Sequence, residues 1–506
     1  MAASKPEREA KEIELKLEFD PAELSGLLSH PILEAAVAAS KTREPISIYY
    51  DTGDDALRKS GVYLRVRATG DGYVQTIKSA RSEGEFLERH EWEQRVPTHA
   101  LDLDAAADTA LAPLLTPEVR ADLQPRFHTR FRRKTYEIRR DASEIELAVD
   151  QGEITAGIKA APISELELEL KAGDKRALFS LARELAETVP LSLAVKTKAE
   201  RGFELLDDAD HTVEKAGAVQ VTADMTGAEA FRTIARSCLR QIVTNTPAMR
   251  GSRAEALHQV RVGLRRLRAG IALLGDVVAD QDREPIKDNL RWIAGELGPA
   301  RDFDVFAADV LEPLRAAHPD NAVLEAAHRD FMERRAAAYA RAIDAVGSGR
   351  FRGAVLDLAA WIEIGRWDEN ALAGHPIGAR AASELSRLRR KIKKKGRALR
   401  DLNAAERHRL RIRAKRLRYA TEFFAATFPG KKSDKRRKKS LAALEDIQDA
   451  LGALNDIAIR KALIATGEKD TQLRAPGADS AEEAARLKEA ERAYERFAKV
   501  KAFWKA

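Results

Sequence analysis

The feature that most constrains the fold is a change in hydrophobic period after about residue 207. Before it, apolar and polar residues alternate in segments such as IELKLEF (13–19), YLRVRAT (63–69) and ISELELEL (163–170), which is the pattern of β-strands with two different faces. After it, Ala, Leu, Arg, Lys and Glu dominate and turn signals are few. The sequence therefore predicts a β-rich half followed by an α-helical half.

The strands of the first half are separated by Gly, Asp and Ser clusters such as TGDGY. Many antiparallel strands in sequence indicate a meander, and closing it into a barrel removes its edges. Short helices are expected near 21–40, 101–115 and 174–188, and a last strand is expected at 192–198 (SLAVKTK). The predicted organisation is a barrel domain at 1–206, a linker at 207–222 and a helical domain at 223–506.

The charge is divided between the two halves. Residues 1–208 carry about 30 Lys and Arg against about 39 Asp and Glu, the rest carries about 57 against about 41, and the whole chain has a net charge of +7. A basic half of this size suggests a polyanionic partner. The single cysteine, Cys238, excludes an intramolecular disulfide. With no apolar leader and no long apolar run, we expect a cytoplasmic protein that does not span a membrane.

The polar positions of the strands carry charges of both signs. Glu12, Glu14 and Lys16 share one face of the first strand, opposite Ile13 and Leu15. A charged face on one strand alone would be explained by exposure to solvent. Taken over all the strands, the pattern indicates a charged barrel interior, in which carboxylates would hold Mg²⁺ or Mn²⁺ and cations would neutralise phosphate oxygens. The charged positions are Glu12, Glu14, Lys16, Arg65, Arg67, Lys78, Arg89, Glu91, Glu93, Arg130, Arg132, Glu146, Asp150, Glu165, Glu167, Glu169, Lys196 and Lys198.

Several of these segments carry a family resemblance. The run Glu12-Ile-Glu14-Leu-Lys16 matches the ExExK signature of the CYTH family, the triphosphate tunnel metalloenzymes. LRVR, TIK, the run from IELAVDQGEI to ISELELEL, and KTKAERGF resemble that family in content and order, over about residues 8–206. The resemblance implies an eight-stranded antiparallel tunnel that removes a terminal phosphate from a triphosphate with a divalent metal.

The resemblance also implies roles for single residues. The implied metal ligands are Glu12, Glu14, Glu146, Asp150, Glu167 and Glu169. The implied phosphate-binding residues are Lys16, Arg65, Arg67, Lys78, Arg89, Arg130, Arg132 and Lys198, and the implied catalytic residues are Glu12, Glu14, Lys16 and Glu91. Which of Arg130, Arg132 and Arg133 faces inward stays open, because one bulge would switch the face.

The helical half contains an internal repeat. HQVRVGLRRLR (258–268) recurs as HRLRIRAKRLR (408–418), and LGPARDFDV (297–305) recurs as LGALNDIAI (451–459), although Asn455 and Ala458 replace Arg301 and Asp304. Two blocks in the same order indicate two similar helical bundles, about 223–365 and 375–506. Each copy places a histidine and three cations on one helical stripe: His258, Arg261, Arg265 and Arg268, then His408, Arg411, Lys415 and Arg418.

This repeat resembles the CHAD domain, a helical domain associated with polyphosphate binding and often fused behind CYTH. The two resemblances together imply a metal-dependent inorganic triphosphatase, converting tripolyphosphate to diphosphate and phosphate, with a polyphosphate-binding helical domain. Two alternatives are a tunnel enzyme for another triphosphate (adenylate cyclase or thiamine triphosphatase) and a non-catalytic polyphosphate-binding or granule-associated protein. Aromatic residues make up only 6% of the chain, and none is interleaved for base stacking, so nucleic acid is not expected as a partner.

Overall fold

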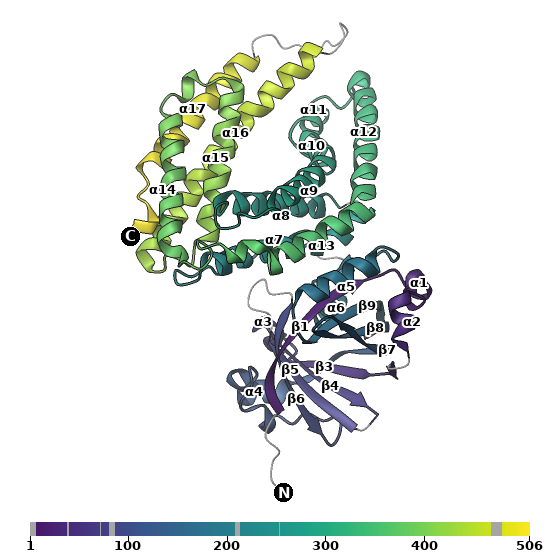
Figure 1. Ribbon diagram of the computed structural model, residues 1–506. Helices are drawn as coiled ribbons and strands as arrows, with labels where there is room; N and C mark the ends of the chain where they lie inside the picture. The colour runs from purple at the N-terminus through teal and green to yellow at the C-terminus, as the bar shows by residue number, and fades with distance from the viewer. Residues whose placement is uncertain are drawn as a thin grey trace. The chain divides into compact units, whose positions relative to one another are not determined.

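The computed structural model describes residues 7–37, 40–70, 72–79, 87–207, 213–251, 253–466 and 478–505 (Figure 1). The chain forms two compact units. One comprises Met1–Ala216, Arg236–Leu264 and Gln281–Gly365, and the other comprises Gly217–Ala235, Arg265–Asp280 and Arg366–Ala506. None of the described helices is both long and apolar enough to cross a membrane.

The first two hundred residues fold into a closed antiparallel barrel. Eight of the described strands pair in the order β1-β6-β5-β4-β3-β7-β8-β9, and β9 returns to pair with β1. Two short strands lie off this ring, because β2 pairs with β7 and β10 pairs with β1. The predicted eight-stranded antiparallel barrel is therefore confirmed. The strands are β1 (Glu7–Glu18), β2 (Lys41–Arg43), β3 (Ile46–Asp51), β4 (Val62–Thr69), β5 (Gly72–Ser79), β6 (Glu88–Val96), β7 (Gln124–Arg140), β8 (Ser143–Ala156), β9 (Lys159–Ala172) and β10 (Ser192–Leu193).

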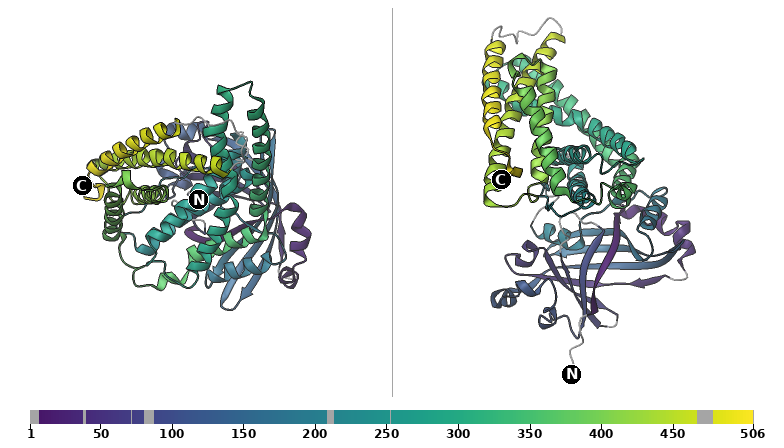
Figure 2. Two further views of the ribbon diagram at one scale, coloured as in Figure 1. Left: turned by 90° about the horizontal axis from the view of Figure 1, so that it is seen from above. Right: turned by 60° about the vertical axis from the view of Figure 1, so that its left-hand side comes forward.

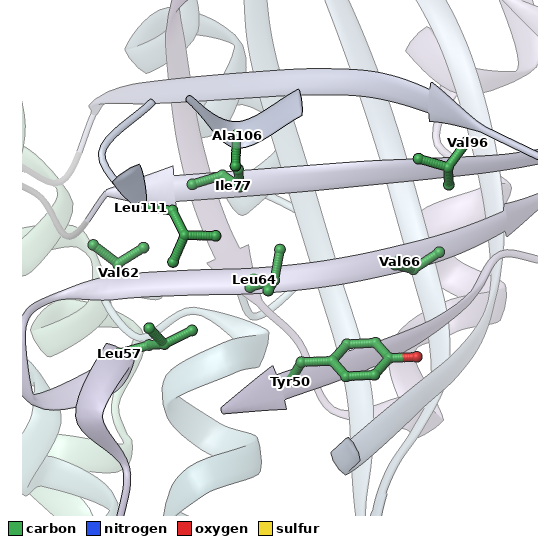
Figure 3. Close-up of a cluster of buried hydrophobic side chains, with 9 residues drawn as sticks. All are labelled: Tyr50, Leu57, Val62, Leu64, Val66, Ile77, Val96, Ala106 and Leu111. Carbon is green, nitrogen blue, oxygen red and sulfur yellow. The ribbon is translucent and has the colours of Figure 1, made fainter. Parts of the chain in front are cut away.

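Short helices cover the outside of the barrel, where the apolar residues of each alternation lie. Leu64 and Val66 of β4, with Ile77 of β5, pack under Leu57, Ala106 and Leu111 in one buried cluster (Figure 3). On the side of β9, the amphipathic helix α5 buries five apolar residues. The helices of this region are η1 (Pro21–Glu23), α1 (Leu24–Leu28), α2 (Pro31–Ala35), α3 (Ala56–Lys59), η3 (Asp104–Ala106), η4 (Ala112–Leu114), α4 (Pro117–Asp122), α5 (Arg176–Ala186) and α6 (Lys198–Leu206).

The strand predicted at 192–198 is wrong for most of its length. Only Ser192 and Leu193 pair as β10, and Lys198 is the first residue of α6. The reason is local: the side chain of Thr197 accepts from the backbone N–H of Glu200, and the side chain of Glu200 accepts from the backbone N–H of Thr197. This capping box satisfies N–H groups that a helix start leaves without partners.

The remainder of the described chain is helical, as predicted. Within the second unit, the long helices α16 and α17 lie side by side (Figures 1 and 2). Residues 213–222 of the predicted linker contain neither helix nor strand, yet Val219 and Val221 are buried. The elements are α7 (Gly227–Arg250), α8 (Ala254–Leu273), α9 (Arg283–Glu296), α10 (Gly298–Phe306), the π-helix η5 (Ala307–Leu311), α11 (Glu312–Ala317), α12 (Ala322–Gly347), α13 (Gly349–Ile364), η6 (Arg366–Glu369), α14 (Ile377–Gly396), η7 (Leu399–Asp401), α15 (Ala404–Phe423), α16 (Lys431–Thr466), α17 (Ala478–Lys499) and η8 (Phe503–Lys505).

The two copies of the helical motif occupy α8 and α15. The apolar stripe beside the cations is buried in both, by Val260, Leu264 and Leu267 on α8 and by Leu410 and Leu417 on α15. The core faces of these helices are therefore as the 3.6-residue period predicts.

Candidate functional site in the barrel

One end of the barrel interior is filled by apolar side chains. Tyr49, Phe127 and Phe131 pack there with Ala199 and Phe203 of α6. Tyr49 and Phe127 stack with ring centroids 4.6 Å apart, and Phe203 meets Phe127 edge-on at 5.1 Å. Helix α6 therefore packs against the interior residues at this end, and it carries Lys198 on its first turn.

A group of opposite charges, which we call the cation cluster, lies next to this apolar end. Lys198 Nζ lies 2.6 Å from Glu165, 2.9 Å from Glu167 and 2.9 Å from Asp150. Arg133 Nη2 lies 2.6 Å from Asp150 and 2.5 Å from Glu167. Lys198 and Arg133 both lie over the ring of Phe131, at 5.1 and 5.5 Å from its centroid. The complete cluster is Asp150, Glu165 and Glu167 with Lys16, Arg133, Lys198 and Arg201.

Opposite charges in this cluster favour the charged forms of the buried Glu167 and Lys198. Burial opposes ionisation of Glu167, but Lys16, Lys198 and Arg133 outweigh it and hold the pKa of that carboxyl well below its usual range. Burial likewise opposes the charge on Lys198, and Asp150, Glu165 and Glu167 raise the pKa of its amine. Glu14 and Glu18 also pair with cations of this cluster, at 3.2 Å from Lys16 and 3.7 Å from Arg201, so its charges are nearly balanced. Four cations nevertheless converge on one part of the interior, where they could also contact an anionic ligand.

A second charged group lies on β1, β5 and β6. Lys78 Nζ lies 2.6 Å from Glu91 and 3.7 Å from Glu12, and Arg65 Nη2 lies 3.4 Å from Glu91. Burial raises the pKa of Glu12 to about 7 against the attraction of Lys78, with the charges of Glu14 and Glu91 adding to the rise. One oxygen of Glu12, Oε2, is buried and has no hydrogen-bond partner. The electrostatics at Glu12 therefore favour either a proton or a cation.

Four carboxylates on neighbouring strands, Glu12, Glu14, Glu146 and Glu169, form what we call the carboxylate row. Glu169 is the cross-strand partner of both Glu14 and Glu146. Like charges at such positions repel. Burial raises the pKa of Glu169, opposed by Lys171 and supported by Glu146 and Glu14. Carboxylate oxygens are the ligands that Mg²⁺ and Mn²⁺ prefer, so the row fits a divalent cation.

A tighter trio of carboxylates exists but fits a metal less well. Among the described residues, oxygens of Asp150, Glu165 and Glu167 lie within 4.8 Å of one another, as metal ligands would. Lys198 and Arg133 already occupy the space between them, and a divalent cation would have to displace these charges. Lys171 lies 2.6 Å from Glu169 in the carboxylate row, but its side chain is 45% exposed and can move away more easily than the buried Lys198. This difference and the raised pKa values of Glu12 and Glu169 favour the carboxylate row instead.

The strand register corrects part of the prediction for β7. Arg130 and Arg132 are exposed on the outer face, whereas Phe131 and Arg133 point inward. Arg130 and Arg132 therefore do not line the interior, and Arg133 does. The prediction for Arg89 concerns a side chain that lies outside the described residues.

Lys196 pairs with Glu204 of α6, at 2.7 Å, rather than with these groups, and the remaining predicted interior residues lie in or beside them. Arg67 donates to Ser47 at 3.4 Å, and burial with the nearby charges of Arg65 and Arg133 lowers its pKa to about 10. The alternation places Glu165 in the interior without a specific role, and it does not predict two further interior residues, Tyr49 and Arg201. Glu165 stands in the same alternation as Glu167, and Arg201 follows Lys198 by less than one helical turn, so both signals are present in the sequence.

Cationic stripes and family relationships

The two cationic stripes differ in exposure along each helix. His258, Arg261 and Arg265 are half-buried and Arg268 is exposed, whereas His408 is exposed and Arg411, Lys415 and Arg418 are half-buried. Arg261 lies 3.8 Å from Asp302, and Arg418 lies 3.5 Å from Glu422. Beside the stripe, Arg266 is almost fully buried and lies 5.5 Å from the ring centroid of Phe423.

Comparisons with known proteins assign both halves to families. Residues 10–203 match the CYTH domain, and residues 233–465 match the CHAD domain. The chain therefore combines a CYTH domain with a CHAD domain, as the motifs predict.

Three individual proteins show the range of similarity. An inorganic triphosphatase of Haemophilus influenzae is 31% identical over 199 residues, which are 38% of this chain and 54% of that protein, so the match spans about half of the relative. The crystal structure of a CHAD domain from Ricinus communis is 27% identical, covering 58% of this chain and 98% of that one with a TM-score of 0.46. An adenylyl cyclase candidate from Hippeastrum with dominant triphosphatase activity is 17% identical, covering 38% and 95% with a TM-score of 0.30.

Proposed function

We propose that the barrel is a metal-dependent triphosphatase that hydrolyses inorganic triphosphate. The observation that carries this proposal is the convergence of four cations in one part of the barrel interior beside a carboxylate row, which meets them where Lys16 lies 3.2 Å from Glu14. A triphosphate needs cations along its oxygens, and hydrolysis needs charge stabilisation at the terminal phosphate. The similarity to the inorganic triphosphatase supports the same activity.

Each group has a part in the proposed reaction. Glu12, Glu14, Glu146 and Glu169 would hold Mg²⁺ or Mn²⁺, which supplies Lewis-acid polarisation of phosphate oxygens. Lys16, Arg65, Arg67, Lys78, Arg133 and Lys198 would neutralise the substrate. A water oxygen bonds to the terminal phosphorus, the bond to the bridging oxygen breaks, and diphosphate leaves with that oxygen. The proton of the water passes to a carboxylate or to solvent.

A substrate panel tests the proposal on the full chain. Phosphate release is measured from tripolyphosphate, ATP, thiamine triphosphate and long-chain polyphosphate, each with Mg²⁺, Mn²⁺ or EDTA. We expect tripolyphosphate with a divalent cation to be the best substrate. Faster turnover of ATP or thiamine triphosphate would assign the barrel to another triphosphate, and no release from any substrate would favour a binding protein.

A pair of matched variants tests the carboxylate row. Glu12→Ala/Glu14→Ala should lower turnover by about a hundredfold or more, because charge stabilisation in the transition state is lost. Glu137→Ala/Glu144→Ala removes two exposed carboxylates from β7 and β8 and should leave turnover unchanged. Full activity of a folded Glu12→Ala/Glu14→Ala variant would exclude the proposed site.

We further propose that the CHAD domain binds polyphosphate through the two stripes. Binding should weaken steeply with salt, because counterions are released from the polyanion. Replacing Arg261, Arg265, Arg411 and Lys415 by alanine should weaken binding more than replacing four exposed lysines of α16 (Lys431, Lys432, Lys435 and Lys438). Equal losses in the two variants, or displacement of polyphosphate by DNA at equal phosphate concentration, would leave only a non-specific basic surface.

A further inference from the structure

The repeated Leu-Gly block contacts the repeated arginine in each copy of the helical motif. In the first copy, Arg261 of α8 donates from Nη1 to the backbone carbonyl of Ala294 at 3.4 Å, beside Gly298 at the start of α10. In the second copy, Arg411 of α15 donates from Nε to the carbonyl of Gln448 at 3.3 Å, beside Gly452 of α16. In both copies the accepting carbonyl lies four residues before the glycine.

The two glycines leave room for a guanidinium. A Cβ atom at position 298 would stand 3.2 Å from Arg261 Nη1, and no other described atom beyond its own helix would lie within 4 Å of it. A Cβ atom at position 452 would stand 2.9 Å from Arg411 Nη2, and its three nearest atoms beyond its own helix all belong to Arg411. Real Cβ contacts are rarely this short, so an alanine at either position would push the guanidinium away.

This arrangement recurs although the local helices differ. In the first copy the carbonyl belongs to the last turn of α9, which ends at Glu296, where carbonyls lack intrahelical partners and favour a cation. In the second copy the carbonyl lies inside the continuous helix α16. A helix end explains why an arginine contacts the carbonyl in the first copy but not in the second. The contact that both copies share therefore has another reason. The shared elements are the arginine, the carbonyl and the glycine.

We propose that Gly298 and Gly452 are positioning residues for polyphosphate binding, each holding the arginine of its own cationic stripe against a neighbouring helix. The guanidinium fork recognises phosphate oxygens only when its plane is oriented, and fixing it in advance removes side-chain freedom that binding would otherwise cost. The ligand class is a linear polyphosphate. This inference rests on the proposed function of the stripes, and it assigns the two copies of the Leu-Gly block a role in polyphosphate binding.

The test compares two pairs of glycine substitutions in the full chain. Gly298→Ala/Gly452→Ala places a methyl group against each arginine. The control, Gly295→Ala/Gly353→Ala, adds a methyl group at two helical glycines where a Cβ atom would have no atom beyond its own helix within 4 Å. Binding of sodium polyphosphate is measured at physiological salt, and thermal unfolding is followed for every variant. We expect the first variant to bind about tenfold more weakly, since hydrogen bonds from oriented charged groups are lost, and the control to bind like the parent protein.

A double-mutant cycle separates positioning from a general packing effect. Arg261→Ala/Arg411→Ala should weaken binding by itself, and adding Gly298→Ala/Gly452→Ala should then cause no further loss, because the glycines act through the arginines. Either single substitution, Gly298→Ala or Gly452→Ala, replaces the pair if the pair does not fold.

Three outcomes would overturn the inference, and they are distinguishable. If the arginine variant binds weakly and the glycine variant binds normally, the glycines do not position the arginines, while the proposed function of the stripes stands. If the glycine variant loses as much affinity without the arginines as with them, its effect is structural. If the arginine variant itself binds like the parent protein, the proposed function of the stripes fails together with the inference.

Discussion

Replacing Arg133 by alanine tests the register of β7, on which the assignment of the barrel interior depends. The side chain of Arg133 is 20% exposed and bonds to Asp150, which is fully buried, and to Glu167. Breaking a buried ion pair typically costs about 3–5 kcal/mol, because a buried charge is left without a partner. Here Lys198 still contacts both carboxylates, so we expect a smaller cost of about 2–3 kcal/mol.

Hydrogen exchange followed by mass spectrometry measures this cost within the full chain. Peptides from β7 and β8 report the opening of this part of the barrel separately from the helices. A loss of about 2–3 kcal/mol corresponds to exchange roughly 30- to 150-fold faster for amides whose exchange rate is set by the opening equilibrium. The control is Arg132→Ala, which removes the same charge from the exposed neighbouring position and should change exchange less than about twofold. Equal effects of the two substitutions would show that Arg133 does not point inward.

Three further predictions concern other contacts. Burial opposes ionisation of Glu165, but Lys198 and Arg201 lower the pKa of this carboxyl. The ionised carboxyl therefore stabilises the barrel above pH 4.5, its ordinary pKa, and this stabilisation is lost as the pH falls through the lower pKa of the folded state. The loss of barrel stability in acid, measured by urea titration, should be shallower in Glu165→Gln than in the parent. Phe203→Ala removes the α6 ring that packs on Phe127 and should cost about 3–5 kcal/mol in urea unfolding, and an unchanged midpoint would contradict the packing of α6 at the apolar end. Arg436→Ala removes donors to the carbonyls of Ala502 and Lys505 and should speed hydrogen exchange at 497–505, whereas the exposed Lys435→Ala should not.

Much of this protein follows from its sequence alone. The period-two alternation separates an apolar face from a charged face on each strand, and this pattern by itself assigns the charged residues of β1, β4 and β9 to one side. The helical period does the same for the buried stripes of α8 and α15, and the internal repeat predicts that the two helices are equivalent. These features are local, because the backbone geometry of a strand or helix fixes which residues share a face.

The tertiary structure determined which of the charged residues meet. Arg133 rather than Arg130 or Arg132 points inward, because β7 pairs with β8 in a register that alternation within one arginine-rich segment could not specify. Lys198 contacts Asp150, Glu165 and Glu167 from a helix rather than from a strand. The capping residues Thr197 and Glu200 are a signal for this helix that the sequence contains. Two features arise only when distant segments pack together. One is the separation of the interior charges into a cation cluster and a carboxylate row, and the other is the contact of Arg261 and Arg411 with two glycines. Sequence patterns carry no information on the distances between such segments.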